Sequence, residues 1–588
     1  MKNTVLFVSH ANLQCGVHEF GNNIGNALSK STLNRFVYVE CSNMGDLNSA
    51  IAEHSPIAII YNYHPSTLPW VTKNAIRNIP VPQIGIVHEV TQEIADNLTN
   101  KLFDYHIAAD PTLLLKNPIV FKTGRLVPGY ENKFALPEVP VIGSFGFATP
   151  NKGFEDIVKG VQHEFDEAVI RFNIPSADFG DKDGSKAREL VEKCKAIITK
   201  PGIKLVVTHD FLSQAGILDF LAQNSINVFL YQDKFGRGLS STVDYALAVG
   251  RPLAISDSLM FRHLHSLEPS IVYGEKGIKE IMNQDASGLA ELKRNWDAEN
   301  LIWEYNRIIA SVLQKEEAKK FQPEVSGFKK FKTAVRAALG LQQKNFSWLR
   351  NTKAASEDTM SVDSSFSYHP IKLNGDEPLN RILDNKARQL YSPAIDALTN
   401  LVPLTMAKKI AEANVQQAFV FDTVYRFIQE YSSPKILCVG SYEDTAAMSL
   451  KRMGYKIEDI DPVLNYFLQE YYTKPTTIHQ SYDIVFSTSV IEHDPDDESF
   501  IDCINGLLKP GGVAVITCDY KDQWKPGDLK PEVDARLYTQ KDLKERLLPL
   551  MTGCELVGEP QWDCPNPDFN YLGKYQYTFA TFVVRKNK

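Results

Sequence analysis

Two stretches of the sequence end in side chains that can move a proton. The apolar run "DIVFSTSV" is followed by Glu492 and His493, and the run "GGVAVITC" is followed by Asp519. Both runs are rich in β-branched residues, which favours buried strands, and α/β proteins bind ligands beyond the carboxyl ends of such strands. Glu492, His493 and Asp519 are therefore candidate catalytic residues that could take a proton from a hydroxyl group. For His493, a purely structural role is an equal alternative.

A nucleoside-binding pattern precedes these residues. The segment "KILCVGSYEDTAAMSLKRMGYKIEDIDPV" predicts a strand, a turn, a helix and a second strand. Gly440 in the turn would leave room for a ligand beside the backbone, and Asp461, about 20 residues later, could accept hydrogen bonds from ribose hydroxyls. Asp459 is the competing acid. Asp444 and Ser489 complete the candidate cofactor-binding set.

From about residue 368 to the end, the chain resembles class I S-adenosylmethionine-dependent methyltransferases. The Glu-His strand end and the following "LLKPGGVAVIT" are the most specific parts of this resemblance, which implies S-adenosylmethionine as cofactor. At the positions of the family's acid and three glycines, this chain has Cys438, Gly440, Tyr442 and Asp444, so only one glycine is kept. The alternative is therefore a Rossmann-like domain that has lost its ligand. The acids of "HDPDDES" favour a helix start over a magnesium site, and no metal is expected.

Four segments of the first 315 residues carry glycines or polar side chains at predicted strand ends and helix starts. Their key residues are a glycine after the first strand, a histidine at a strand end, a lysine before a helix, and a cluster around "FGRGLSSTVDYAL": Gly16, His88, Lys152, Arg237, Ser240, Ser241 and Asp244. Backbone N–H groups at a helix start, together with Lys152 and Arg237, would stabilise the negative charge of a leaving diphosphate. The alternatives to ligand binding are that "GLSS" is an ordinary capped helix start and that His88 has a structural role.

These segments, in this order, resemble the retaining glycosyltransferase family 4, which has the GT-B fold. The resemblance implies a nucleotide-sugar donor held by Gly16, Lys152, Arg237, Ser240 and Ser241, an active-site histidine at His88, and transfer that needs no metal. It also implies that Asp244, which matches the second of the family's two glutamates, holds the ribose. The first glutamate falls on a non-acidic position near Gly236 or Arg237.

The elements that must position these residues alternate between strands and helices almost from end to end. At 588 residues the chain is too long for one core. We expect an α/β protein with a GT-B pair of Rossmann-like domains at 1–138 and 139–315, the second closed by a long helix over 289–313. A linker follows at 316–367. A methyltransferase Rossmann-like domain is expected at 368–588.

Composition excludes several classes of protein. The net charge of −8 argues against a nucleic-acid partner, and neither a signal peptide nor a membrane span is expected. The cysteines are scattered, as in a reduced, cytoplasmic protein. Within the linker, residues 327–350 are basic with one apolar helical face. This helix could lie on an anionic membrane surface at the inner face of the cytoplasmic membrane, although docking on a domain is slightly favoured.

The resulting hypothesis is a bifunctional enzyme. One part would transfer a sugar from a nucleotide-sugar donor to a glycan or lipid-linked glycan acceptor, and the other would methylate a sugar hydroxyl. The resemblance implies a setting in bacterial surface polysaccharide synthesis. One alternative is a methyltransferase whose GT-B part only binds glycans. Another is an active glycosyltransferase whose methyltransferase fold serves for docking or dimerisation.

Overall fold

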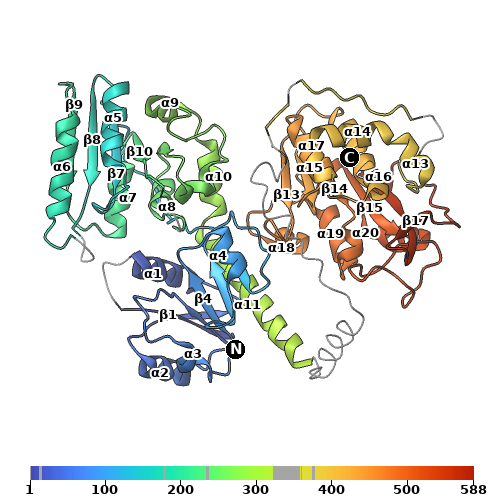
Figure 1. Ribbon diagram of the computed structural model, residues 1–588, viewed down its shortest axis with the longest axis horizontal. Helices are drawn as coiled ribbons and strands as arrows, with labels where there is room; N and C mark the ends of the chain where they lie inside the picture. The colour runs from blue at the N-terminus through green and yellow to red at the C-terminus, as the bar shows by residue number, and fades with distance from the viewer. Residues whose placement is uncertain are drawn as a thin grey trace, which may run out of the picture. The chain divides into compact units, whose positions relative to one another are not determined.

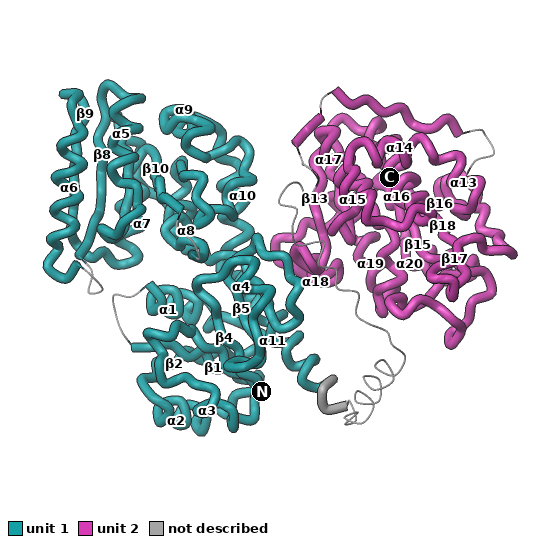
Figure 2. The backbone as a smooth tube through the Cα atoms, viewed as in Figure 1, with its two compact units in different colours: residues 1–331 teal, residues 332–588 magenta. Residues whose placement is uncertain are grey.

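The computed structural model describes residues 2–11, 16–176, 181–233, 237–321, 358, 361–363, 365–373 and 378–588. The chain forms two compact units, residues 1–331 and residues 332–588, which are described separately below (Figure 2). The predicted basic helix at 327–350 lies outside the described residues. In the described part of the chain, no helix has the length and apolar character needed to cross a membrane.

The first half of unit 1 is a parallel sheet with helices between its strands (Figure 1). The strand order is β2-β1-β3-β4-β5-β6. The strands are β1 (Thr4–Ser9), β2 (Arg35–Glu40), β3 (Ala58–Tyr61), β4 (Gln83–Val87), β5 (Tyr105–Ala108) and β6 (Val120–Lys122). The helices are α1 (Gly16–Leu28), α2 (Met44–His54), α3 (Lys73–Ile76) and α4 (Gln92–Asn97).

The second half of unit 1 is another parallel sheet, in the order β11-β10-β7-β8-β9. Its strands are β7 (Val141–Phe145), β8 (Ala168–Asn173), β9 (Ile203–Thr208), β10 (Ile226–Phe229) and β11 (Leu253–Ile255). Its helices are α5 (Phe154–Glu164), α6 (Ser185–Ile197), α7 (Gln214–Ala222), α8 (Thr242–Ala248), α9 (Ile278–Asn283) and α10 (Ser287–Asn295). Both sheets are built from short, apolar, mostly buried strands, as parallel sheets require.

The last helix of unit 1 returns to the first half. The single helix expected over 289–313 is two helices, because α10 ends at Asn295 and α11 runs from Ala298 to Phe321. On α11, Leu301, Tyr305, Ile308 and Val312 are buried in the core of the first half. The C-terminal helix therefore ties the two halves of unit 1 together.

Unit 2 is a mixed sheet in the order β13-β12-β14-β15-β18-β16, with β17 paired to β18. Strands β13, β12, β14 and β15 are parallel, whereas β18 is antiparallel to β15 and β16 to β18. The strands are β12 (Ile436–Val439), β13 (Ile457–Ile460), β14 (Tyr482–Thr488), β15 (Leu508–Tyr520), β16 (Cys554–Leu556), β17 (Phe569–Tyr571) and β18 (Tyr575–Lys586). The "KPGG" segment is part of β15, whose pairing with β14 shifts register there.

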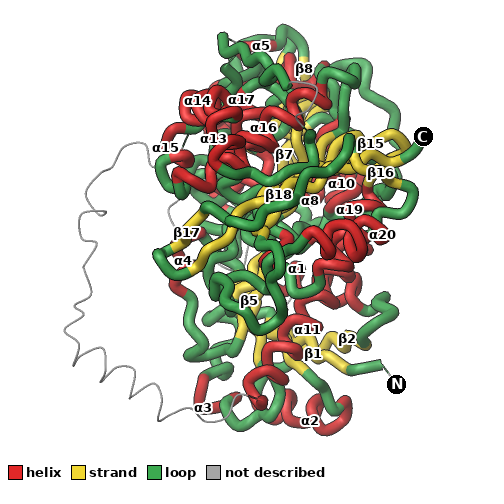
Figure 3. Tube along the Cα trace, turned by 90° about the vertical axis from the view of Figure 1, so that its right-hand side faces the viewer, coloured by secondary structure: helices red, strands yellow, loops and turns green. Residues whose placement is uncertain are grey.

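Helices cover both faces of this sheet (Figure 3). They are α13 (Asn385–Leu390), α14 (Ser392–Leu401), α15 (Pro403–Met406), α16 (Asn414–Ile428), α17 (Thr445–Arg452), α18 (Leu468–Thr473), α19 (Asp497–Leu507) and α20 (Leu548–Leu550). Part of the expected linker belongs to this unit. The Asp358 carboxylate accepts hydrogen bonds from the N–H groups of Leu404 and Thr405, and the Asp363 N–H donates to the Arg452 carbonyl.

Candidate functional site

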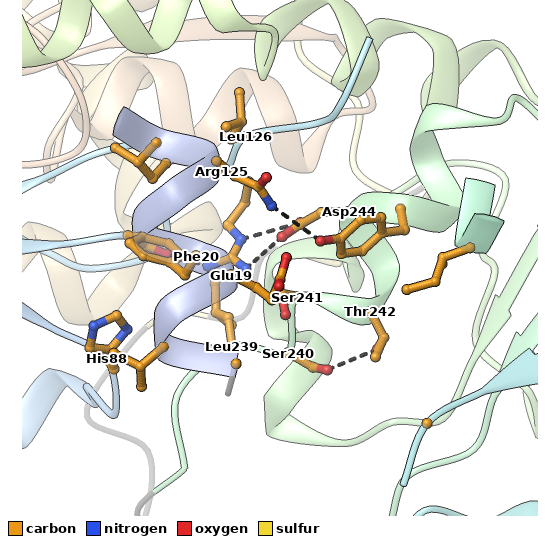
Figure 4. Close-up of a pocket in the computed structure, with 18 of the residues that line it drawn as sticks. Glu19, Phe20, His88, Arg125, Leu126, Leu239, Ser240, Ser241, Thr242 and Asp244 are labelled. Atoms are coloured by element: carbon orange, nitrogen blue, oxygen red, sulfur yellow. Dashed lines mark hydrogen bonds and ion pairs between the residues drawn. The ribbon is translucent and has the colours of Figure 1, made fainter. Parts of the chain in front are cut away.

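A pocket of about 560 Å³ lies between the two halves of unit 1 (Figure 4). It is bounded by strand ends and helix starts from both sheets. All seven residues that the sequence singled out in this unit line it: Gly16, His88, Lys152, Arg237, Ser240, Ser241 and Asp244. Residues far apart in the sequence thus meet where GT-B proteins would bind a donor, although the role of each residue stays a prediction.

Lys152 brings an unneutralised positive charge to this pocket. It precedes α5 in a turn where Gly153 has a φ of 70°, and a Cβ at Gly153 would lie 1.9 Å from the Leu230 carbonyl oxygen. Only glycine fits there, so the turn that presents Lys152 is fixed by its sequence. The ammonium lies over the Tyr231 ring, 3.8 Å from its centroid. Lys152 forms no ion pair with any residue that the structure describes, so its charge is available to an anion.

Hydroxyl groups gather at the start of α8. The Ser240 hydroxyl is 2.9 Å from that of Thr242, and the Ser241 side chain makes no capping hydrogen bond to the helix. Ser241 is therefore not a conventional N-cap, which leaves its hydroxyl facing the pocket. On the opposite wall α1 begins at Gly16, and the space around this glycine is open.

A buried ion pair joins the two halves beside these groups. Arg125, which follows β6, donates from Nη2 and Nε to both carboxylate oxygens of Asp244 on α8, at 2.6 and 3.2 Å, and from Nη1 to the Ala109 carbonyl. Both side chains are almost fully buried, and burial raises the pKa of Asp244 against the opposing effect of Arg125. Each Asp244 oxygen accepts one hydrogen bond from Arg125 and keeps a further acceptor position, so the expectation that Asp244 holds the ribose stays a prediction. Sequence reasoning missed Arg125, whose only signal was a basic residue after a strand.

Three further contacts connect the two halves of unit 1. Arg237 forms an ion pair with Glu89, so the charge expected to act on the diphosphate is partnered. Next to it, a Cβ at Gly238 would lie 2.4 Å from the His88 carbonyl oxygen, so only glycine allows this approach of the two backbones. Arg262 likewise pairs with the buried Asp110.

His88 is a neutral histidine with a defined tautomer. The Asn62 side chain donates from Nδ2 to the Val17 carbonyl at 2.7 Å, which turns its Oδ1 toward His88 Nε2 at 2.8 Å. Because an amide oxygen only accepts, Nε2 must carry the ring proton and Nδ1 keeps its lone pair. Burial lowers the pKa of His88 to about 4, so the ring stays neutral at pH 7. It can accept a hydrogen bond at Nδ1 but carries no charge.

In unit 2 the chain runs from β12 to β13 on one side and returns to β14 on the other. The general rule for such sheets predicts a ligand crevice at the carboxyl ends of β12 and β14. Gly440 follows β12 with a φ of 80°, and a Cβ there would lie 2.2 Å from Val490 Cγ2. In this structure the Val490 side chain occupies the space beside Gly440. The role of Gly440 toward a ligand stays a prediction. Ser489 follows β14 and donates from Oγ to Glu492 Oε1 at 2.6 Å.

The residues of this crevice fit a polar, hydrogen-bonding ligand. Asp461 accepts hydrogen bonds from the N–H groups of Tyr442 and Val463, at 3.2 and 2.7 Å, and each of its oxygens keeps a further acceptor position. The hydroxyls of Ser441 and Ser487 are buried without a hydrogen-bond partner, which a ligand with polar groups would provide. Asp444, by contrast, is employed as the N-cap of α17, where it accepts from the Ala447 N–H.

Two of the three catalytic candidates in unit 2 are inaccessible. Glu492 exposes 0% of its surface and Asp519 is also buried. Burial raises the pKa of both carboxyl groups, and the proximity of the two acids raises that of Asp519 further. Burial and the nearby like charge therefore favour the protonated form of Asp519, and burial favours that of Glu492. A protonated acid cannot act as a base, and the catalytic roles of both residues stay predictions.

His493 is accessible but is paired with an acid. Its Nδ1 lies 3.1 Å from Oδ1 of the buried Asp534, and 43% of the imidazole side chain is exposed. The hydrogen bond that His493 donates to the Asp534 carboxylate raises the pKa of His493 to about 9, so the ring is protonated at pH 7. A protonated imidazole cannot accept a proton, which argues against His493 as a base at neutral pH. No local pattern in the sequence marked Asp534 as a functional residue. In the described residues, no group of histidine, cysteine and acidic side chains is arranged to hold a metal ion.

Comparison with known proteins bears on each unit. Residues 444–516 match a family described as a methyltransferase domain. Unit 2 contains a methyltransferase domain. The match begins at Asp444, the last residue before α17, and includes β13, β14 and most of β15. Asp461 and Ser489 lie within it, whereas Gly440 and Ser441 precede it. Among curated proteins, none matches the chain.

Several solved glycosyltransferase structures are similar to about half of the chain. Anabaena HepE in complex with UDP and glucose is 13% identical, covering 52% of this chain and 99% of its own, with a TM-score of 0.38. A Rickettsia africae glycosyltransferase is 11% identical (53% and 99%, TM-score 0.40). The sucrose-phosphate synthase of Thermosynechococcus elongatus is 13% identical (53% and 100%, TM-score 0.39). Because these scores lie below 0.5, the GT-B fold of unit 1 is assigned from its own two parallel sheets, the pocket between them and the returning α11.

The Arg125–Asp244 pair should dominate the stability of unit 1. Arg125→Met leaves a buried carboxylate without its cation, so we expect a loss of about 3–5 kcal/mol in the free energy of unfolding. The double variant Arg125→Met/Asp244→Leu removes both charges and should recover most of that loss. Urea unfolding measures both, with Lys193→Ala, which breaks an exposed pair with Glu189, as a control expected to cost under about 1 kcal/mol. A single-variant loss no larger than the control's would mean that water reaches Asp244.

The Asp534 carboxylate should hold the proton on His493. NMR titration of the intact chain is expected to give a His493 pKa of about 9, and Asp534→Asn should lower it toward the ordinary value of 6.5. Because the folded-state pKa is raised, the pair stabilises the fold fully below pH 6.5 and loses that contribution as pH rises toward 9. His493→Gln identifies the resonance, and Asp502→Asn, an exposed acid on α19, should leave it unchanged. A wild-type pKa near 6.5 would contradict this assignment.

Proposed function

We propose that the chain is a bifunctional enzyme that transfers a sugar and a methyl group. The observation that carries the first activity is the pocket between the halves of unit 1, into which Lys152 brings an unpaired positive charge. In the proposed transfer, the bond between the sugar carbon and the donor diphosphate breaks and a bond to an acceptor hydroxyl forms. The diphosphate leaves with the electron pair and takes up the hydroxyl proton. Lys152 and the hydroxyls of Ser240 and Ser241 would stabilise its growing negative charge.

His88 is proposed to position the sugar. Its neutral Nδ1 accepts a hydrogen bond from a hydroxyl, and Asn62 fixes the ring orientation. A neutral ring also avoids electrostatic repulsion of the positive charge that develops on the sugar carbon. Retention of configuration, a glycan or lipid-linked glycan acceptor and a role in bacterial surface polysaccharide synthesis belong to the proposal and rest on the sequence resemblance. Location in the cytoplasm, with contact at the membrane surface, is proposed on the same basis.

The methyltransferase domain carries the second activity. S-adenosylmethionine would supply an activated methyl group in the crevice beyond β12 and β14. Asp461 would accept hydrogen bonds from its ribose, and Ser441 and Ser487 offer hydroxyls that otherwise lack partners. We propose a sugar hydroxyl as the methyl acceptor. Fusion to unit 1 would raise the local concentration of a freshly extended glycan at the second site.

One observation favours an alternative for unit 1. Two of the residues expected to bind the donor, Arg237 and Asp244, are engaged in ion pairs with Glu89 and Arg125. A unit that cannot release them would bind a glycan without transferring sugar, and the methyltransferase would be the only catalyst. Release of nucleotide from a panel of sugar donors distinguishes the two functions.

Loss of the Lys152 charge should impair sugar transfer. We expect Lys152→Ala to reduce nucleotide release by roughly 10²-fold, because one charge acting on the diphosphate is lost, and Lys152→Arg to retain part of the activity. Lys159→Ala, an exposed lysine on α5 paired with Asp156, is the matched control and should have little effect. EDTA should leave the activity of the wild type intact. Activity that is lost with EDTA and restored by manganese would contradict the proposed metal-free transfer.

Removal of the Asp461 carboxylate should weaken cofactor binding. Asp461→Ala takes away the proposed acceptors for the ribose, and we expect at least about tenfold weaker binding of S-adenosylhomocysteine by calorimetry. Asp461→Asn, which keeps one acceptor oxygen and the shape, should lose less. Melting temperatures must accompany both, because Asp461 also holds the turn at Tyr442. If wild type does not bind the compound, or Asp461→Ala binds as tightly, this contact is wrong.

A further inference from the structure

The charged side chains that line the pocket of unit 1 are mostly paired. Apart from histidines, six described residues of the lining carry charge: Glu19, Glu89, Arg125, Lys152, Arg237 and Asp244. Four of them form the pairs Arg125–Asp244 and Arg237–Glu89. Glu19 and Lys152 form no hydrogen bond or ion pair with any residue that the structure describes. One negative and one positive charge are therefore left for ligands.

These two charges come from opposite walls. Lys152 precedes α5 in the second half of unit 1. Glu19 lies in the first turn of α1 in the first half, across from the start of α8 (Figure 4). Glu19 is flanked by Phe20 and Asn23, and its charge contributes to raising the pKa of Tyr245. An acid in a first turn stabilises the helix dipole. The helix dipole explains why a glutamate stands at position 19 in α1. It does not explain why the half-buried Glu19 carboxylate lies in the wall of a pocket with no cation among the described residues paired to it.

A carboxylate without a cation discriminates between ligands by charge. It only accepts hydrogen bonds, so it favours hydroxyl groups and repels another carboxylate, and the repulsion is stronger in a partly desolvated pocket than in water. If the donor diphosphate binds to Lys152, the Lys152 charge cannot offset the repulsion between Glu19 and a carboxylate on the sugar. Arg125 is held by both oxygens of Asp244, and Arg237 by Glu89. No unpaired cation thus remains among the described lining residues for an acidic sugar.

We propose that Glu19 determines the class of sugar transferred. It accepts hydrogen bonds from the hydroxyls of a neutral sugar and excludes a sugar acid such as a uronic acid. This inference rests on the proposed glycosyltransferase function and adds a specificity-determining residue to it. The diphosphate then lies toward Lys152 and the sugar toward α1, so the two ends of the donor are recognised by charges of opposite sign.

Calorimetry on the full-length chain tests this, with UDP, UDP-glucose and UDP-glucuronic acid as one series and GDP, GDP-mannose and GDP-mannuronic acid as the other. In the series that binds, wild type should bind the acidic sugar nucleotide at least about tenfold more weakly than the neutral one. Glu19→Gln removes the charge but keeps the size. Glu19→Gln should reduce the ratio of the affinities for the neutral and the acidic sugar nucleotide at least about fivefold. It should leave the affinity for the bare nucleotide unchanged.

Two further variants locate the effect. Glu93→Gln changes a first-turn glutamate on α4 that does not line the pocket, and it should leave every affinity unchanged. Lys152→Ala should weaken all three ligands of a series to the same degree. If Glu19→Gln leaves the ratio unchanged, or weakens the bare nucleotide as much as its sugar esters, the inference is overturned while the proposed function stands. A wild type that binds neither series overturns the proposed function, and the inference with it.

Discussion

The buried ion pair between Arg125 and Asp244 sets the arrangement of the rest of unit 1. It joins a loop of the first half to α8 of the second, and removing either charge leaves the other buried and alone. The pair therefore fixes how far apart the two walls of the pocket lie. The close approach of Gly238 to the His88 carbonyl is possible only at that separation, as is the pairing of Arg237 with Glu89.

The same pairing decides which charges a ligand meets. An arginine that is fully engaged by a carboxylate contributes little field to the pocket, so a lining with three positive and three negative side chains acts as a lining with one of each. Lys152 lies over the ring of Tyr231 and pairs with no acid that the structure describes. Selectivity in such a pocket depends more on where the partners are than on how many charges it contains.

Periodicity and turn residues predicted the two parallel sheets and a long closing helix, and the resemblance to a known family singled out the residues that gather at the pocket. They could not predict the partners. Arg125 and Asp244 are separated by 119 positions, and nothing local in the sequence marks one as the counter-charge of the other. Asp534 was missed for the same reason, since it lies in a loop and meets His493 only through the fold. Gly440 was recognised as a glycine that the fold requires, but the side chain beside it is that of Val490.

The two units use their acids in opposite ways. In unit 1, Asp244 pairs with an arginine, and Glu19 pairs with no residue that the structure describes. In unit 2, burial raises the pKa of Glu492 and Asp519, and Asp534 pairs with His493. A base for a hydroxyl acceptor must be unprotonated when the acceptor arrives. Of Glu492, His493 and Asp519, only His493 reaches solvent. His493 can be an unprotonated base only when Asp534 no longer stabilises the proton on its imidazole ring.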